Sequence, residues 1–288
     1  MSIEIKHLTH IYNPGTPFEH KALDDINLKI EDNEFICIIG HTGSGKSTLI
    51  QHLNALLVPE SGEVLLNGEN IYADRSKLKS VRQRVGLVFQ YPEHQLFEMT
   101  VYKDVAYGPG NLGLPQEEID SRVKNALETV GLDESVYDKS PFELSGGQRR
   151  RAAIAGVLAM EPEVLILDEP TAGLDPKGRD EILDSIKLMH EKRKIIVILV
   201  SHSMEDVAKL ADRIIVLNDG KVVLTGTPRE VFSKVNELEK IGLAAPQITY
   251  VLSELAAKGY DVRTDIYTVA EATEELYKFL KQDRKSVV

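Results

Sequence analysis

A glycine-rich run that ends in Lys-Ser-Thr has the composition of a phosphate-binding loop. It follows the apolar run FICII and precedes STLIQHLNALL, which has a helical pattern. Glycines let successive backbone N–H groups point at phosphate oxygens, and the helix N-terminus adds positive potential. In such a loop Lys46 bridges the β- and γ-phosphates, and the Ser47 hydroxyl binds Mg²⁺. The run therefore predicts an ATP-type site, against the alternative of a Gly-rich turn with a chance Lys-Ser pair. Its residues are Gly40, His41, Thr42, Gly43, Ser44, Gly45, Lys46, Ser47 and Thr48.

Two acids end a second apolar run, VLILDEP, which extends from Val164 to Pro170. We expect Asp168, at the end of a buried strand, to hold Mg²⁺ through water. Glu169 would face the γ-phosphate and orient or deprotonate the attacking water, a contribution typically worth about 10²–10⁴-fold in rate. The alternative is a strand followed by a solvated acidic turn. The phosphate-binding loop favours the catalytic interpretation.

A third run, ELSGGQRRR, opens a helical pattern. Ser145 can cap the helix, while Gly146 and Gly147 expose backbone donors. An isolated Ser-Gly-Gly is usually an ordinary helix cap. Beside the two motifs above, it predicts a second anion-binding site.

These motifs together resemble the ATP-binding subunits of ABC transporters, whose signature is LSGGQ. The resemblance covers roughly residues 3–230 and includes the family's motifs in order. It implies that Tyr12 stacks on adenine, with Phe18 as a nearby alternative. It also implies that Gln90 senses Mg²⁺ and the γ-phosphate, and that His202 in LVSHSMEDV contacts the γ-phosphate.

The family's mechanism is a head-to-tail dimer that closes over ATP. The resemblance implies that Ser145, Gly146, Gly147 and Gln148 cover ATP held by the other subunit, and that TAGLDP, with its acid Asp175, lies where the subunits touch. Closure excludes water and strengthens the electrostatic contacts in the site. ATP then holds the pair together and hydrolysis reopens it.

The apolar runs predict an α/β fold. FICIIG, EVLILD and KIIVILVS are continuous β-branched runs, typical of parallel strands buried on both faces. IEIKHLTHIY and ALDDINLKI have the character of half-buried strands, and Asn67-Gly68 and Asp219-Gly220 favour hairpins. We expect a P-loop NTPase (RecA-like) core with an antiparallel β subdomain.

Helical patterns interrupt and extend this core. Between about residues 91 and 156 the strand signal disappears, and PQEEIDSRVKNALETVGL has one apolar helix face between Pro115 and Gly131. We therefore expect residues 1–230 to form the ATP-binding domain, with a helical signature-motif subdomain inside it. Residues 231–288 would form a small C-terminal helical extension that contributes to dimerisation.

Bulk properties exclude several classes of protein. A net charge of −11 over 288 residues argues against nucleic-acid binding. The single cysteine, Cys37, cannot form a disulfide framework, as suits a reducing cytosol. We see no signal peptide and no run of the roughly 20 apolar residues that span a bilayer. A membrane role must therefore act through a partner, with the chain peripheral on the cytoplasmic face.

Two function classes follow from the resemblance. One is a transporter motor; the other is a soluble ABC ATPase in DNA repair, chromosomes or ribosomes. The absence of long heptads and of a second ATP-binding domain favours the motor. The block FQYPEHQLFEMTVYKDVAYGPGNLG resembles the ATPases of energy-coupling-factor importers, especially the second of their pair. Motors of other importer classes stay an alternative.

The importer resemblance implies partners. Two ATPases form a heterodimer, with a homodimer as the alternative, under a transmembrane T component that engages a substrate-binding S component for a vitamin or metal ion. The T component would dock near Gln90–Phe97, with Leu96 and Phe97 giving apolar contact and Glu93 pairing with an arginine of the partner. The alternative is that Leu96 and Phe97 pack on the helical subdomain itself.

Overall fold

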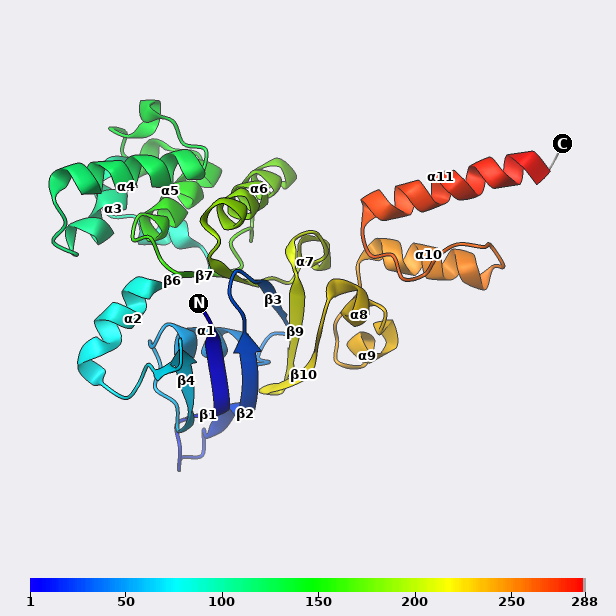
Figure 1. Cartoon of the computed structure of the whole chain (residues 1–288), viewed down its shortest axis with the longest axis horizontal. Helices are drawn as coiled ribbons and strands as arrows, with labels where there is room; N and C mark the ends of the chain where they lie inside the picture. The colour runs from blue at the N-terminus through cyan, green and yellow to red at the C-terminus, as the bar shows by residue number, and fades with distance from the viewer. Residues whose placement is uncertain (287–288) are drawn as a thin grey trace.

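The computed structural model describes residues 1–286, side chains to residue 280, and contains two β-sheets flanked by helices (Figure 1). The strands are β1 Ile3–Tyr12, β2 His20–Ile30, β3 Phe35–Ile39, β4 Ser61–Leu66, β5 Glu69–Asn70, β6 Val85–Val88, β7 Val164–Asp168, β8 Ile196–Val200, β9 Arg213–Asn218 and β10 Lys221–Gly226. The α-helices are α1 Lys46–Leu53, α2 Leu78–Arg84, α3 Val101–Gly110, α4 Gln116–Thr129, α5 Gly146–Leu158, α6 Pro176–Arg193, α7 Met204–Leu210, α8 Pro228–Phe232, α9 Val235–Lys240, α10 Gln247–Ala257 and α11 Val269–Ser286. Short 3₁₀ helices are η1 Arg75–Lys77, η2 Pro92–Gln95, η3 Glu134–Val136 and η4 Pro141–Glu143.

The central sheet has the strand order β10-β9-β3-β8-β7-β6. Strands β3, β6, β7, β8 and β9 are parallel, and β10 pairs antiparallel with β9. The predicted continuous runs are β3, β7 and β8, and their apolar residues are buried as expected. Because parallel strands end at the same edge, the segments that follow β3, β6, β7 and β8 meet there. That edge carries the candidate site.

The second sheet is antiparallel, in the order β2-β1-β4-β5. Both predicted hairpins are present: Asn67 and Gly68 connect β4 to β5, and Asp219 and Gly220 connect β9 to β10. All four residues have positive φ, between 46° and 83°. Two consecutive left-handed residues are what a two-residue hairpin turn requires. The antiparallel sheet and the parallel core confirm the predicted fold class.

The helical insertion is formed by α3, α4 and α5, which gather on one side of the central sheet (Figure 1). Helix α4 begins after Pro115 and is followed by Gly131 at φ 70°, as the sequence predicts. Helix α3 begins at a Thr100 cap whose side chain accepts a hydrogen bond from the Lys103 N–H.

In the C-terminal region, helices α8 and α9 pack differently from α10 and α11. The sequence predicts one helix over PREVFSKVNELEKIGL, but Lys234 has ψ 45°, outside the helical region, so α8 and α9 are separate. Val231 and Phe232 are buried in the main core. Helices α10 and α11 share a small cluster of their own and extend away from the body of the molecule, although Tyr250 of α10 also packs against the main core (Figure 1). None of the helices within residues 1–286 has the length and apolar character of a membrane span.

Candidate functional site

A cavity of about 590 Å³ lies at the carboxyl edge of the central sheet. The chain segments that line it come from both sheets and from the loops after β3, β6, β7 and β8. Most of the residues that line it are predicted site residues. Those residues are Tyr12, Thr42, Gly43, Gly45, Lys46, Ser47, Thr48, Gln90, Glu169 and His202.

At two positions of the glycine-rich loop, neighbouring backbone leaves no room for a side chain, so only glycine fits. Gly45 has φ 102°, and a Cβ there would lie 2.5 Å from the Ala22 carbonyl oxygen. A Cβ on Gly40 would lie 2.4 Å from the Leu217 carbonyl oxygen. The loop therefore approaches neighbouring backbone on two sides, and side chains are excluded from those contacts.

Lys46 lies across the loop and is mostly buried. Its Nζ donates to the carbonyl oxygens of Gly40 at 2.6 Å and His41 at 2.9 Å. Burial lowers the pKa of this ammonium, while Glu169 and Asp168 oppose that effect. The ammonium is held at the cavity wall by neutral carbonyls, so it can attract an anion without first breaking an ion pair.

Asp168 and Glu169 lie at the end of β7, with Glu169 at φ 49°. The Ser47 hydroxyl donates to Asp168 Oδ2 at 3.4 Å, so the loop hydroxyl and the strand-end carboxylate are neighbours as predicted. Burial raises the pKa of Asp168, and the adjacent Glu169 raises it further. A carboxylate destabilised in this way favours a cation beside it.

Gln90 and His202 both contact Glu169. His202 Nε2 lies 2.7 Å from Glu169 Oε1, and Gln90 Nε2 donates to Oε2 at 3.3 Å. Three residues that stand far apart in the sequence are therefore joined at one carboxylate.

Tyr12 also lines the cavity, and its hydroxyl is 3.2 Å from Thr48 Oγ1. Its ring contacts His10 edge to face, and His10 in turn contacts the fully buried His52. Phe18, the alternative aromatic, is largely exposed and does not line the cavity. The geometry favours Tyr12 as the aromatic residue beside a bound base.

The signature residues lie outside this cavity. Ser145 caps α5 by accepting a hydrogen bond from the Gln148 N–H, and the Gln148 side chain accepts from the Ser145 N–H. Gly146 and Gly147 border open space. Asp175 is likewise exposed and caps α6 by accepting from the Gly178 N–H at 3.2 Å. The chain therefore gathers the predicted nucleotide-contacting residues in one cavity, while the predicted signature residues and Asp175 lie at the surface outside it.

Comparison with known proteins gives a consistent result. The family model described as ABC transporter matches residues 23–172. The chain is 60% identical over 98% of its length, and over the whole relative, to "Energy-coupling factor transporter ATP-binding protein EcfA2" of Clostridium perfringens. It is also 60% identical to the protein of that name from Clostridium tetani, over 96% of this chain and 97% of the relative.

The chain belongs to the ABC transporter ATPase family. Within that family it groups with the energy-coupling factor ATP-binding proteins, and its enzymatic activity is ATP hydrolysis coupled to transport. The sequence-based assignment to the family is confirmed.

Solved structures of the family agree with the fold. The structure of cbiO1 from Clostridium perfringens, described as part of the ABC transporter complex cbiONQ, matches with a TM-score of 0.75 and 41% identity, over 87% of this chain and 98% of that one. A dimeric ATP-binding cassette in a post-hydrolysis state, bound to ADP and Pi, matches with a TM-score of 0.70 and 31% identity, over 78% of this chain and 98% of that one.

The segment after Gln90 differs from expectation at Glu93. Glu93 forms an ion pair within the chain, with Arg150 of α5. Arg150 Nε donates to Glu93 Oε2 at 2.9 Å, and Arg150 Nη2 donates to Glu93 Oε1 at 2.6 Å. The predicted pairing of Glu93 with an arginine of a membrane partner stays a prediction, and it would require the carboxylate to leave Arg150. Arg150 was missed because the run Arg149-Arg150-Arg151 reads as a solvated basic face, yet Arg150 is only 2% exposed.

Leu96 and Phe97 differ in their exposure to solvent. Leu96 is half-buried and packs against the main core. Phe97 is 61% exposed and contacts Tyr107 edge to face, with ring centroids 5.0 Å apart. Asp104 accepts hydrogen bonds from the N–H groups of Phe97 and Glu98, which fixes the backbone that presents Phe97.

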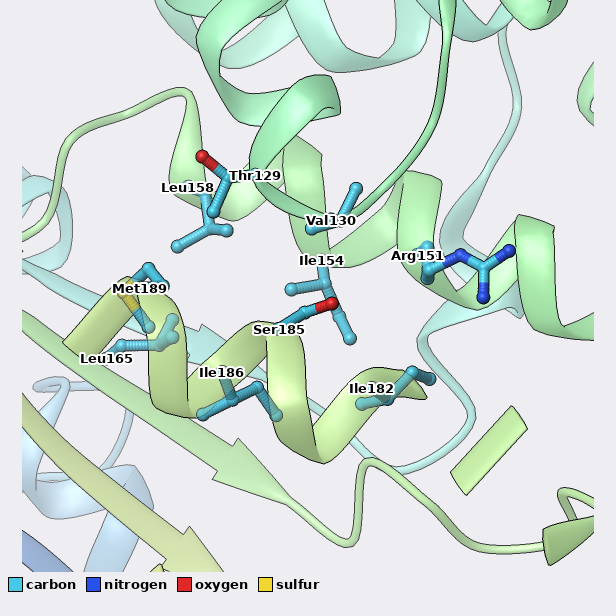
Figure 2. Close-up of a pocket in the computed structure, with 10 residues that line it drawn as sticks. All are labelled: Thr129, Val130, Arg151, Ile154, Leu158, Leu165, Ile182, Ser185, Ile186 and Met189. Carbon is cyan, nitrogen blue, oxygen red and sulfur yellow. The ribbon is translucent and has the colours of Figure 1, made fainter. Parts of the chain in front are cut away.

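An apolar seam joins the signature helix to the core of this ABC ATPase (Figure 2). It leaves a void of about 10 Å³, room for at most one water. Side chains of α5 and α6 meet in this seam with Leu165 of β7, the strand that ends at Asp168. The apolar side chains of the seam are Val130, Ile154, Leu158, Leu165, Ile182, Ile186 and Met189.

Proposed function

We propose that this ABC ATPase is the motor of an energy-coupling factor importer and powers uptake of a vitamin or metal ion through separate membrane subunits. The observation that carries the proposal is the near full-length identity of 60% to proteins named for that transporter, C-terminal extension included. The chain would be peripheral on the cytoplasmic face of the membrane.

Within the cavity, the residues take the following roles. Tyr12 stacks on adenine, and the loop Gly40–Thr48 holds the phosphates, with Lys46 at the β- and γ-oxygens. Glu169 orients the attacking water and accepts its proton, while Gln90 and His202 fix that carboxylate through the contacts at 3.3 and 2.7 Å. A carboxylate held from both oxygens loses little freedom when the reaction begins.

The donor set fits Mg²⁺. Ser47 Oγ and the Asp168 carboxylate are hard oxygen donors 3.4 Å apart, the kind of ligand that Mg²⁺ accepts together with water and phosphate oxygens. The side-chain oxygen of Gln90 is the third candidate. When bound, the ion neutralises charge on the phosphates. The proximity of the Ser47 hydroxyl to the Asp168 carboxylate is the observation that supports a cation there, and burial, which raises the pKa of Asp168, agrees with it.

A second ATPase subunit completes the site. Ser145, Gly146, Gly147 and Gln148 begin α5, and the backbone of Gly146 and Gly147 borders open space, which leaves room for the ATP of another subunit. We prefer a heterodimer with a related ATPase, and Asp175 would lie at the shared boundary. Helix α10 exposes Val251 and helix α11 exposes Val269 and Leu280, and we propose that the two helices hold the two ATPases together between cycles.

The T component docks beside Phe97. A groove of about 390 Å³ lies between α2 and the helical insertion, and its lining includes Tyr107, the ring partner of Phe97. The apolar lining residues Leu87, Phe89 and Val157 suit an amphipathic helix of a membrane protein. Leu96, which is half-buried against the main core, would add a smaller apolar contact than Phe97.

Co-purification tests the proposed function. An affinity-tagged chain expressed in its native cells should be recovered from detergent-solubilised membranes with a second ATPase and an integral membrane protein. Recovery of the chain alone, or with nucleic acid, would favour a soluble ABC ATPase and overturn the transport role.

A further inference from the structure

One buried guanidinium joins three segments that are distant in the sequence. Arg150 Nε and Nη2 donate to the two carboxylate oxygens of Glu93. Arg150 Nη1 donates to the carbonyl oxygen of Pro170 at 3.1 Å and to that of Ala172. Every guanidinium nitrogen is thus hydrogen-bonded, and the charge is paired with one carboxylate inside the fold.

The anchored residues flank two side chains of the candidate active site. Glu93 stands three residues after Gln90, and Pro170 directly follows Glu169. The Ala172 N–H donates to the Glu169 carbonyl oxygen at 3.1 Å, so the turn after Glu169 is held at both ends. Arg150 therefore connects the backbone after Gln90 to the backbone after Glu169.

Tyr91 makes this connection tighter. It has φ 55°, a left-handed conformation that a tyrosine adopts only when its surroundings hold it there. The Arg150 guanidinium carbon lies 5.6 Å from the centre of its ring. The ring adds a cation–π contact to the pair with Glu93. The residue that directly follows Gln90 is thus fixed by the same side chain.

The electrostatics are consistent with a permanent pair. Burial would raise the pKa of Glu93, but its bonds to Arg150 outweigh burial and the pKa lies below its ordinary value. Lysine could not replace this arginine without loss, because an ammonium cannot donate in a planar fork to a carboxylate and two carbonyls together.

We propose that Arg150 is a positioning residue for ATP hydrolysis: it sets the separation of Gln90 and Glu169 by anchoring the residues that follow each of them. The inference rests on the roles proposed above for those two residues. Arg150 contacts none of the residues that line the nucleotide cavity. Its replacement should therefore slow the chemical step and leave nucleotide binding intact.

The test is single-turnover ATP hydrolysis by the full-length chain in its purified transporter complex. The partner subunit has its own rate, so the phase that belongs to this chain is the one that Glu169→Gln abolishes. Arg150→Lys should slow that phase by about 10- to 100-fold, as small misplacements of catalytic groups do. The dissociation constant for a non-hydrolysable ATP analogue should stay within about twofold of the wild-type value.

A matched control and a double substitution separate positioning from general damage. Arg122→Lys alters an arginine–glutamate pair of the same helical insertion, with Glu118, and should leave the rate unchanged. Arg150→Lys should slow hydrolysis by a certain factor in the wild type and by a smaller factor in a Gln90→Ala background. The second factor should be at least about threefold smaller than the first, because part of the effect of Arg150 passes through Gln90. A purely structural role predicts the full loss in both backgrounds.

Glu93→Gln keeps Arg150 and its two carbonyl partners. If Arg150→Lys does not fold, this variant tests the positioning role of Arg150 in its place. It should slow the same phase by about 3- to 10-fold. A wild-type rate in Glu93→Gln, or in a folded Arg150→Lys, overturns the inference, and so does an equal loss of ATP-analogue affinity. If Glu169→Gln itself abolishes no phase, the proposed function fails instead.

Discussion

His202 Nε2 lies 2.7 Å from Glu169 Oε1, and this contact organises the candidate site. The histidine follows β8 and the glutamate ends β7, two neighbouring parallel strands. Gln90, which follows β6, reaches the other carboxylate oxygen at 3.3 Å. The neighbouring positions of β6, β7 and β8 in the sheet therefore bring together three side chains that are far apart in the sequence.

Lys46→Ala should weaken ATP binding by about 100-fold, because the substitution removes the buried ammonium that faces the phosphates. Isothermal calorimetry with ATP measures this directly. Lys209→Ala, at an exposed lysine 3.6 Å from Asp180, is the matched control and should bind ATP normally. Unchanged affinity in Lys46→Ala would contradict the assignment of the phosphate-binding loop.

His52→Gln should flatten the pH dependence of stability. Burial, together with the neighbouring His10, lowers the pKa of His52 to about 4, against about 6.5 when unfolded. Between those values the unfolded chain binds the extra proton, so stability falls as the pH falls. From pH 7 to pH 5 the wild type should lose about 2 kcal/mol more unfolding free energy than the variant. Denaturant titrations at both pH values measure this; parallel losses would show that His52 is not buried in its neutral form.

The sequence was sufficient to predict the fold class because the signals were local. Continuous β-branched runs mark β3, β7 and β8, and paired turn residues such as Asn67-Gly68 mark the hairpins. The glycine-rich loop could likewise be predicted from the sequence, since its conformation depends on its own residues. The break at Lys234 was not, because no Gly or Pro marks it.

The interaction of Glu93 with Arg150 could not be predicted, because the two residues are 57 positions apart and each is of an ordinarily exposed type. Of three consecutive arginines, Arg150 is the most deeply buried, and Arg151 pairs with Glu181 on α6. Which residue of the run faces the core depends on the rotation of the helix against its neighbours, a tertiary property.

Phe97→Ala should weaken assembly with the membrane component by about tenfold, since an exposed aromatic held on a fixed backbone is a typical interface anchor. The yield of transporter complex from solubilised membranes measures this, with ATP affinity of the chain as the check on folding. Val223→Ala, at an exposed residue of the opposite sheet edge, should leave the yield unchanged. Equal yields for Phe97→Ala and wild type would remove Phe97 from the docking surface.

A chain that ends at Pro246 should lose nucleotide-free dimers and keep its ATP affinity. The cut removes α10 and α11 while retaining Phe232, Leu238 and Leu243, which are buried in the main core. A cut at Gly226 would expose that core and confuse the result. Light scattering without nucleotide reports the dimer content, and an unchanged dimer fraction would contradict a dimerisation role for the extension.

The most direct test of the account is single-turnover hydrolysis of radiolabelled ATP by the transporter complex that carries Glu169→Gln. The amide keeps the shape of the side chain but cannot accept a proton, so hydrolysis at this chain's site should slow by about 10²–10⁴-fold. The account predicts that uncleaved ATP stays bound in a closed pair of ATPases. Conversion of all the bound ATP to ADP at the wild-type rate would contradict it.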